Sequence, residues 1–163
     1  MKMLVATDGS EYSRLALEQA ADLAQATHSE ILVLSVSQLV NLGTVGPMVY
    51  APESAFEVPT KEESEAILKE ASEYLASRGI AHQTVRVIGQ PAEAILHTAE
   101  EEHVTLIVMG SHGRTGLQRF LLGSVSNQVI SHSSVSVLVA RAPRPSKAAS
   151  CPDEPVVQKA IKI

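Results

Sequence analysis

A glycine-rich segment has the residue types and the spacing of a phosphate-binding loop. It runs Gly110-Ser111-His112-Gly113-Arg114-Thr115-Gly116, and nine residues separate Gly113 from Gly123. Glycine lets backbone N–H groups approach a phosphate because no Cβ stands in the way. Ser124-Val125-Ser126 follows where a helix is predicted to start, and the first N–H groups of a helix favour anions. We therefore expect an anion here, with the two serine hydroxyls and the Arg114 guanidinium as further donors.

The same residues also permit a structural interpretation, a glycine-rich turn in which Ser124 is only an N-cap. Two better-known phosphate loops are excluded by spacing, since the chain has no G-x-x-x-x-G-K-[ST] and no G-x-G-x-x-G after its first strand. We interpret His112 as packing or hydrogen-bonding locally. The other five histidines have no metal-ligand spacing, and no nucleophile–base–acid arrangement can be assembled.

Two other predicted strand ends carry residues that suit a ligand. Thr7-Asp8-Gly9 follows the first buried strand, and Val36-Ser37 ends the second. In open α/β sheets, ligands bind beyond the carboxyl ends of the strands, at the switch point where strand order reverses. Asp8 could contact that ligand or cap the first helix, and we favour ligand contact.

Buried apolar runs alternate with helical patterns along the chain. Strands are expected at residues 3–6, 31–36, 82–88, 104–109 and 135–140. Helices are expected from Ser10 to about Ala26, from the capping box Thr60/Glu63 to Gly79, from Gly89-Gln90-Pro91 onward and from near Ser124. This alternation predicts a single-domain α/β three-layer sandwich: a five-stranded, mainly parallel sheet, for which we expect the order 3-2-1-4-5, with helices on both faces.

The domain is expected to span residues 1–141, followed by a Pro-rich C-terminal tail over 142–163. Residues 37–59 form a long connection rich in Gly and Pro. Connections of this length inside compact domains are usually functional or disordered, and a tolerated surface insertion is an equally open interpretation.

The composition of the chain limits the classes of partner that it can be expected to bind. Lys and Arg number 13 against 18 Asp and Glu, a formal charge of −5 that argues against a broad face for nucleic acid. The single cysteine, Cys151, cannot form an internal disulfide. The N-terminus lacks a signal-peptide pattern, and no apolar stretch approaches the roughly 20 residues that span a bilayer. We expect a cytoplasmic protein with no nucleic-acid or membrane partner.

The glycine segment resembles one family specifically. G-x-x-G, nine residues and then G-[ST] is the nucleotide-binding signature of universal stress proteins, and it is complete here at Gly110, Gly113, Gly123 and Ser124. Residues 6–10, 108–113 and 122–126 resemble the same family. The resemblance covers about residues 1–141 and leaves the tail outside.

The resemblance implies bound ATP, with Mg²⁺ held mainly by the phosphates. It places the adenine near Val36, whose backbone would contact the base edge, and it places Thr7 and Asp8 near the ribose or adenine. Ala6 stands where some ATP-binding members have proline, a change that alters turn stiffness and removes no donor. The implied nucleotide-binding residues are Ala6, Thr7, Asp8, Val36, Met109, Gly110, His112, Gly113, Arg114, Gly123, Ser124, Val125 and Ser126.

Three functions compete. The favoured one is a binding module and not an enzyme, namely an ATP-dependent switch or regulator in stress response with an unknown protein partner. We also expect a homodimer formed through the strand at 135–141, as the resemblance also implies. The alternative is a slow nucleotide hydrolase or adenylyl-transfer relative, which needs a base or an acid pair near the γ-phosphate. A phosphoacceptor receiver would need clustered acids and a lysine, where this chain offers Asp8 and Arg141.

Overall fold

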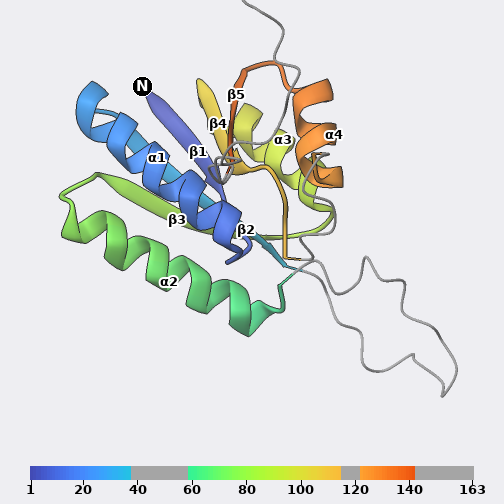
Figure 1. Cartoon of the computed structure of the whole chain (residues 1–163), viewed down its shortest axis with the longest axis horizontal. Helices are drawn as coiled ribbons and strands as arrows, with labels where there is room; N and C mark the ends of the chain where they lie inside the picture. The colour runs from blue at the N-terminus through green and yellow to red at the C-terminus, as the bar shows by residue number, and fades with distance from the viewer. Residues whose placement is uncertain (38–58, 115–121, 142–163) are drawn as a thin grey trace, which may run out of the picture.

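The computed structural model of the chain describes residues 1–37, 59–114 and 122–141. Strands and helices alternate through these ranges, as the sequence predicts (Figure 1). In chain order the elements are β1 (Lys2–Ala6), α1 (Glu11–Thr27), β2 (Glu30–Ser37), α2 (Lys61–Ser77), β3 (His82–Ile88), α3 (Pro91–Glu101), β4 (Leu106–Gly110), α4 (Ser124–His132) and β5 (Ser136–Ala140). The predicted connection after β2 falls mostly on residues 38–58, and the predicted tail is 142–163; both lie outside the described residues.

The five strands form one sheet in the order β3-β2-β1-β4-β5, and all four strand pairs are parallel. The predicted order is confirmed. The chain moves outward from β1 through β2 to β3 and then crosses to β4 on the opposite side of β1 (Figure 1). The switch point is therefore the boundary between β1 and β4, at the carboxyl ends of these strands.

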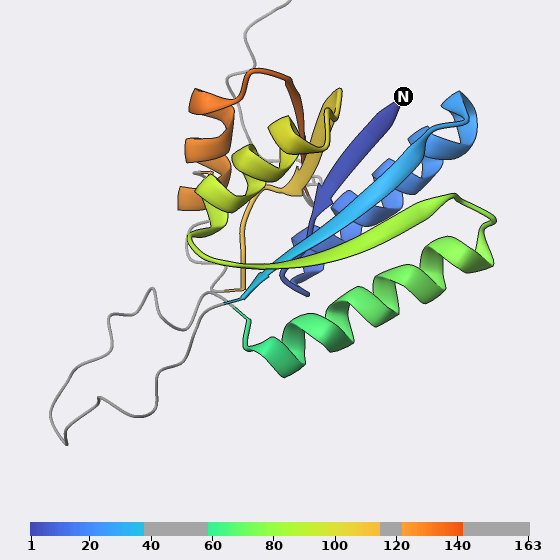
Figure 2. The same cartoon turned by 180° about the vertical axis from the view of Figure 1, so that it is seen from behind.

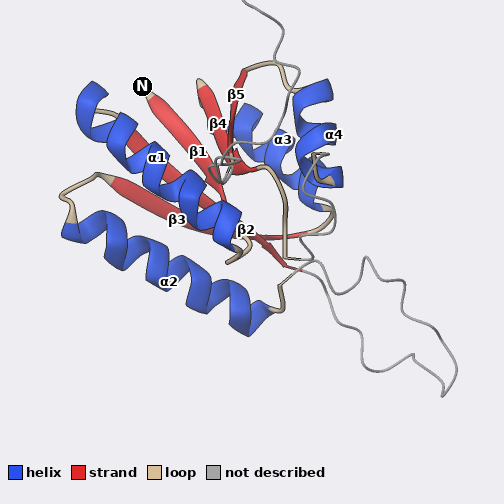
Figure 3. Ribbon diagram, in the orientation of Figure 1, coloured by secondary structure: helices blue, strands red, loops and turns tan. Residues whose placement is uncertain are grey.

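Helices cover both faces of the sheet, which confirms the three layers (Figure 3). Alternation along β1 sends Met3 and Val5 into a core with α1 and α2, and Leu4 into a second core with α3 and α4. Figure 2 shows the sheet from behind, with the helices α3 and α4 that cover the second core. Aliphatic residues and alanine fill both cores, as an aromatic-poor composition requires. Among the described residues, no helix has the length and apolar character to cross a membrane.

Local hydrogen bonds set several element ends. The predicted capping box at α2 is present: Glu63 N–H donates to Thr60 Oγ1 (3.2 Å), and Thr60 N–H donates to Glu63 Oε2 (2.8 Å). Gly79 ends this helix with a φ of +68°, a conformation that glycine adopts without steric strain. Ser10 is the N-cap of α1, so the helix itself begins one residue later than predicted.

Two predicted strands begin later than the sequence indicates. β4 starts at Leu106 instead of residue 104, because Val104 N–H is bonded to Ala99 O at the end of α3 (3.1 Å). β5 starts at Ser136 instead of residue 135, because Val135 N–H donates to the Ser133 hydroxyl (3.2 Å). In both places the backbone N–H group of the expected first strand residue donates to a nearby turn, so the hydrogen bonds between strands begin later.

Helix α1 passes unusually close to the end of β4 at Gly110. A Cβ built on Gly110 would lie 2.8 Å from both the backbone carbon and the Cβ of Tyr12, and 3.0 Å from the backbone nitrogen of Ser13. Two of these contacts are with helix backbone, which cannot move aside as a flexible side chain can. Gly110 is thus required by the packing of α1 on β4, a role that differs from the predicted approach to phosphate.

We predict that Gly110→Ala lowers the free energy of unfolding by about 1–3 kcal/mol, as overpacking does in a close-packed core. Urea unfolding of the variant and the wild type measures the difference. An unchanged midpoint and slope would show that α1 and β4 separate easily, contrary to the geometry at Tyr12.

Candidate functional site

Two backbone hydrogen bonds fix Ser111, the first residue after β4. Ser111 N–H donates to Ala140 O at the end of β5 (2.9 Å), and Ser111 O accepts from Gly123 N–H (2.8 Å). Ala6 pairs with Met109 in the sheet register, so the turn after β1 begins beside this loop. The start of α4, the glycine loop and the turn after β1 therefore meet at one edge of the sheet, as the sequence predicts.

The first turn of α4 presents backbone donors at this edge. Its N-cap is Gly123, with extended backbone and no side-chain cap hydrogen bond, and its first helical bond runs from Asn127 N–H to Gly123 O (3.0 Å). The N–H groups of residues 124–126 therefore have no acceptor within the helix, and the positive end of the helix dipole adds to them. The interpretation of Ser124 as an N-cap is wrong, because Ser124 is the first helical residue.

The two serine hydroxyls of this turn have different surroundings. Ser124 is exposed, whereas Ser126 is buried and donates its hydroxyl hydrogen to Gly110 O (2.9 Å). That bond ties α4 to the end of β4. The Ser126 hydroxyl, expected as a phosphate donor, thus has a structural partner, and Val125 is half-buried against the α3–α4 core.

Gly113 and Gly123 mark two close approaches inside the site. A Cβ on Gly113 would lie 3.0 Å from Asp8 Oδ2, and a Cβ on Gly123 would lie 3.3 Å from Ser111 O. The other carboxylate oxygen of Asp8 accepts Ser10 N–H (3.0 Å). Since Ser10 caps α1, capping of this helix by Asp8 is excluded. The Asp8 carboxylate instead faces the glycine loop, while its ligand contact stays a prediction.

Thr7 is buried in the turn after β1. Its N–H donates to Leu34 O (2.9 Å), and its hydroxyl donates to the Ser13 hydroxyl (3.2 Å), which in turn donates to Ser10 O (3.0 Å). These bonds hold the turn against the first turn of α1. Ser13 was not singled out from the sequence, because a serine in a helix shows no pattern that reveals such a contact.

The backbone of Val36 faces the switch point. Ala6, the last residue of β1, pairs with Leu34, so β2 extends past the end of β1. Leu34 O accepts Thr7 N–H, which means that the backbone groups of Leu34 face β1. Hydrogen-bonding direction alternates along a strand, and Val36 therefore directs its N–H and C=O to the same side, beyond Ala6. A contact with a base edge would need this orientation.

His112 packs against its neighbours, as expected from the sequence. Its ring lies against Tyr12 of α1, with centroids 5.1 Å apart and planes at 44°, and its Nδ1 is 3.1 Å from Ser111 Oγ. Sequence reasoning missed Tyr12. The available signal was an aromatic residue, rare in this chain, in the first turn of the helix that follows β1.

Arg114 contacts a carboxylate of another element. Its guanidinium donates two hydrogen bonds to Glu63 in the first turn of α2, NH1 to Oε2 (3.0 Å) and NH2 to Oε1 (2.8 Å). Arg114 and then the Thr60 N–H lower the pKa of Glu63 from 4.5 to about 2. The same bond raises the pKa of Arg114, with a smaller contribution from Asp8. The expected phosphate ligand Arg114 is thus held by Glu63, a residue that the sequence indicated only as part of a capping box.

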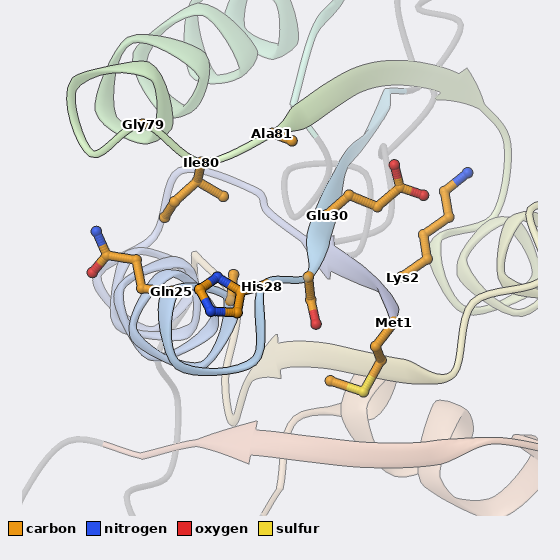
Figure 4. A pocket seen from close by; sticks show the side chains of 10 residues that line it. Met1, Lys2, Gln25, His28, Glu30, Gly79, Ile80 and Ala81 are labelled. Atoms are coloured by element: carbon orange, nitrogen blue, oxygen red, sulfur yellow. The ribbon is translucent and has the colours of Figure 1, made fainter.

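A separate hollow of about 760 Å³ opens at the opposite, amino edge of the sheet. Figure 4 shows its lining side chains, which come from the starts of β1 and β2, the end of α1 and the turn after α2. They include Lys2, Gln25, His28, Glu30 and Ile80. Lys2 forms an ion pair with Glu102 outside the hollow. The hollow lies at the amino ends of the strands and is therefore separate from the switch point, which lies at their carboxyl ends.

Comparison with known proteins agrees with the fold and with the glycine signature. The model of the universal stress protein family matches residues 1–141. The chain belongs to the universal stress protein family. Universal stress protein YxiE of Bacillus subtilis is 39% identical over 145 residues, which cover 86% of this chain and 98% of that protein.

Solved universal stress proteins share the fold. The structure of protein MJ0577 of Methanocaldococcus jannaschii superposes with a TM-score of 0.71 at 32% identity, covering 88% of this chain and 97% of that one. A universal stress protein solved in complex with cAMP gives a TM-score of 0.61 at 27% identity, covering 86% and 95%. The family match therefore favours a universal stress protein over the phosphoacceptor receiver.

The low pKa of Glu63 predicts how its contribution to stability depends on pH. A depressed folded-state pKa stabilises the protein above the unfolded value of 4.5, and this stabilisation is lost as pH falls toward about 2. Glu63→Gln should therefore lower the free energy of unfolding at pH 7, by less than about 1 kcal/mol because the pair is partly exposed. The difference from the wild type should shrink between pH 5 and pH 2.

Urea unfolding at a series of pH values measures that difference. Glutamine at this position preserves the capping box, so the variant removes charge and keeps the helix start. Glu62→Gln, in the same exposed turn, is the control for general loss of charge. A Glu63→Gln effect that stays constant down to pH 2 would contradict the ion pair.

Proposed function

We propose that this chain binds an adenine nucleotide, ATP above all, at the switch point. We further propose that it acts as a nucleotide-dependent switch or regulator in stress response. The observation that carries the proposal is the first turn of α4, whose N–H groups open onto the glycine loop beside a glycine N-cap. Phosphate at this position would accept those N–H groups and meet the positive helix end. The relative solved with cAMP supports an adenine nucleotide as the ligand class.

The other end of the nucleotide would lie toward β2. The backbone N–H and C=O of Val36 offer one donor and one acceptor beyond the end of β1, which is the pattern that a base edge needs. Asp8 lies between this position and the glycine loop, and its carboxylate would accept hydroxyl hydrogens of the ribose. Base, sugar and phosphates would then follow the carboxyl edge from β2 across β1 to α4.

A divalent ion would arrive with the phosphates. Among the described residues, no cluster of three or more His, Cys, Asp or Glu is arranged to hold a metal ion. Mg²⁺ commonly keeps several waters and binds through one or two carboxylates together with phosphates. The ion would therefore be held mainly by the phosphates, with waters completing its coordination.

We propose binding without appreciable turnover. Phosphoryl transfer to water requires a group that orients or activates the nucleophile. Glu63, with its pKa held near 2 by Arg114, is a poor base at neutral pH. Asp8 already accepts the N–H of Ser10 with one oxygen. These contacts favour the binding module over the hydrolase.

We predict that the protein, stripped of co-purified nucleotide, binds Mg-ATP with one molecule per chain in calorimetry. Gly123→Ala should weaken binding at least tenfold, about 1.4 kcal/mol, because the new Cβ presses on Ser111 O where the loop is pinned. Ser124→Ala should weaken binding severalfold and leave stability within about 0.5 kcal/mol, since its hydroxyl is no cap.

Ser131→Ala is the matched control, because it removes a hydroxyl from the last turn of the same helix, far from the loop. Its ATP affinity should equal that of the wild type. Phosphate release, followed in the same samples, should stay far below about 1 per second. Absence of wild-type binding at millimolar ATP would refute the proposal.

We also propose that the chain forms a homodimer through β5. Ala140 O accepts a hydrogen bond from Ser111 beside β4, so Leu138 also faces β4, and Val137 and Val139 direct their backbone groups outward. In the described part of the chain, no strand pairs with this outer side. Such an edge of half-buried valines is a template for pairing with a second copy.

Val137→Pro tests this pairing because it removes one outward N–H and leaves the bonds to β4 in place. We predict a dimer for the wild type and a monomer for the variant in size-exclusion chromatography with light scattering. Val137→Thr, which keeps the N–H and a branched side chain, should remain a dimer. A monomeric wild type at high micromolar concentration would overturn the proposal.

A further inference from the structure

The ion pair between Arg114 and Glu63 joins the glycine loop to helix α2. The two residues are 51 positions apart in sequence, and their side chains are 34% and 44% exposed. Arg114 directly follows Gly113, the residue whose position faces Asp8 Oδ2. The Arg114 side chain therefore connects the candidate phosphate loop with the first turn of α2.

The Glu63 carboxylate is held in place from its own helix. Oε2 accepts Thr60 N–H within the capping box as well as Arg114, while Oε1 accepts Arg114 alone. One of its two oxygens is thus held by a bond that does not involve Arg114. Arg114 docks on it with the two-pronged geometry that a guanidinium also uses for phosphate.

Phosphate and Glu63 would therefore compete for the pair of Arg114 N–H groups that now bind Glu63. A guanidinium fork bonded to a carboxylate cannot offer the same two N–H groups to a ligand. The first turn of α4 can receive phosphate without Arg114, because its donors are backbone N–H groups. Arg114 could offer these two N–H groups to phosphate only after leaving Glu63, and until then the carboxylate partly neutralises its charge.

Resting on the proposed nucleotide function, we propose that Glu63 is an internal competitor for Arg114: the phosphates of a bound nucleotide displace the carboxylate, recruit the guanidinium and release the first turn of α2 from the loop. Glu63 keeps its bond to Thr60 in the bound state, so α2 stays capped. Nucleotide occupancy at the carboxyl edge is thereby transmitted to the start of α2, and Glu63 lowers the affinity for phosphorylated ligands.

A positioning role for Glu63 predicts the opposite result. If Glu63 held Arg114 in the orientation that phosphate needs, loss of its charge would weaken binding. Competition predicts that the same change tightens binding. The sign of the effect thus separates the two mechanisms.

The experiment is calorimetry with Mg-ATP and with adenosine, which lacks phosphate, on the stripped wild type, Glu63→Gln, Arg114→Gln and the double variant. Glu63→Gln should bind ATP up to about fivefold more tightly than the wild type, which corresponds to the free energy of a partly exposed ion pair. Its affinity for adenosine should equal that of the wild type. Arg114→Gln should weaken ATP binding. In the Arg114→Gln background, Glu63→Gln should have no effect on ATP.

Glu62→Gln controls for the general loss of negative charge near the loop and should leave the ATP affinity unchanged. The inference is overturned if Glu63→Gln leaves ATP affinity unchanged or weakens it, if it strengthens adenosine binding equally, or if its effect persists without Arg114. Wild-type ATP binding combined with any of these results refutes the competition alone. If neither the wild type nor Glu63→Gln binds ATP or adenosine, the proposed function fails and the inference fails with it.

Discussion

Backbone hydrogen bonds of one residue hold three elements together beside the switch point. Ser111 donates to Ala140 at the end of β5 and accepts from Gly123 at the start of α4. The chain directly after β4 is thereby fixed to the sheet on one side and to a helix end on the other. Because α4 begins with Gly123 as its cap, the backbone donors of its first turn stay directed at the loop. The other site features, including Asp8 and Arg114, are arranged around this frame.

Close approach of neighbouring groups explains why glycines occupy the signature, and the group differs from one glycine to the next. Gly110 admits helix α1, whose backbone at Tyr12 would meet a Cβ at 2.8 Å. Gly113 leaves room for the Asp8 carboxylate, and Gly123 lies against the carbonyl of Ser111. A motif that reads as one phosphate loop is therefore also a packing device that brings α1, the turn after β1 and α4 together.

Charge at this edge is balanced locally. The chain carries a formal charge of −5, and two carboxylates, Asp8 and Glu63, lie beside the loop with Arg114. An anionic ligand must gain its stabilisation from oriented backbone N–H groups, because the net charge opposes it. The Arg114–Glu63 pair makes this balance adjustable, since the same guanidinium can neutralise either a carboxylate or a phosphate.

The sequence by itself determined the alternation of strands and helices, the capping box of α2, the strand order and the place of the glycine signature. These features depend on local periods and caps, on chain connectivity and on a family motif, all of which can be read along the chain. Only the tertiary structure decided that Arg114 binds Glu63, that the Ser126 hydroxyl bonds to Gly110 and that Gly110 accommodates α1. Each of these contacts joins residues that lie 16 to 98 positions apart, or turns on the space between packed elements, and such distances are set by how helices settle on the sheet.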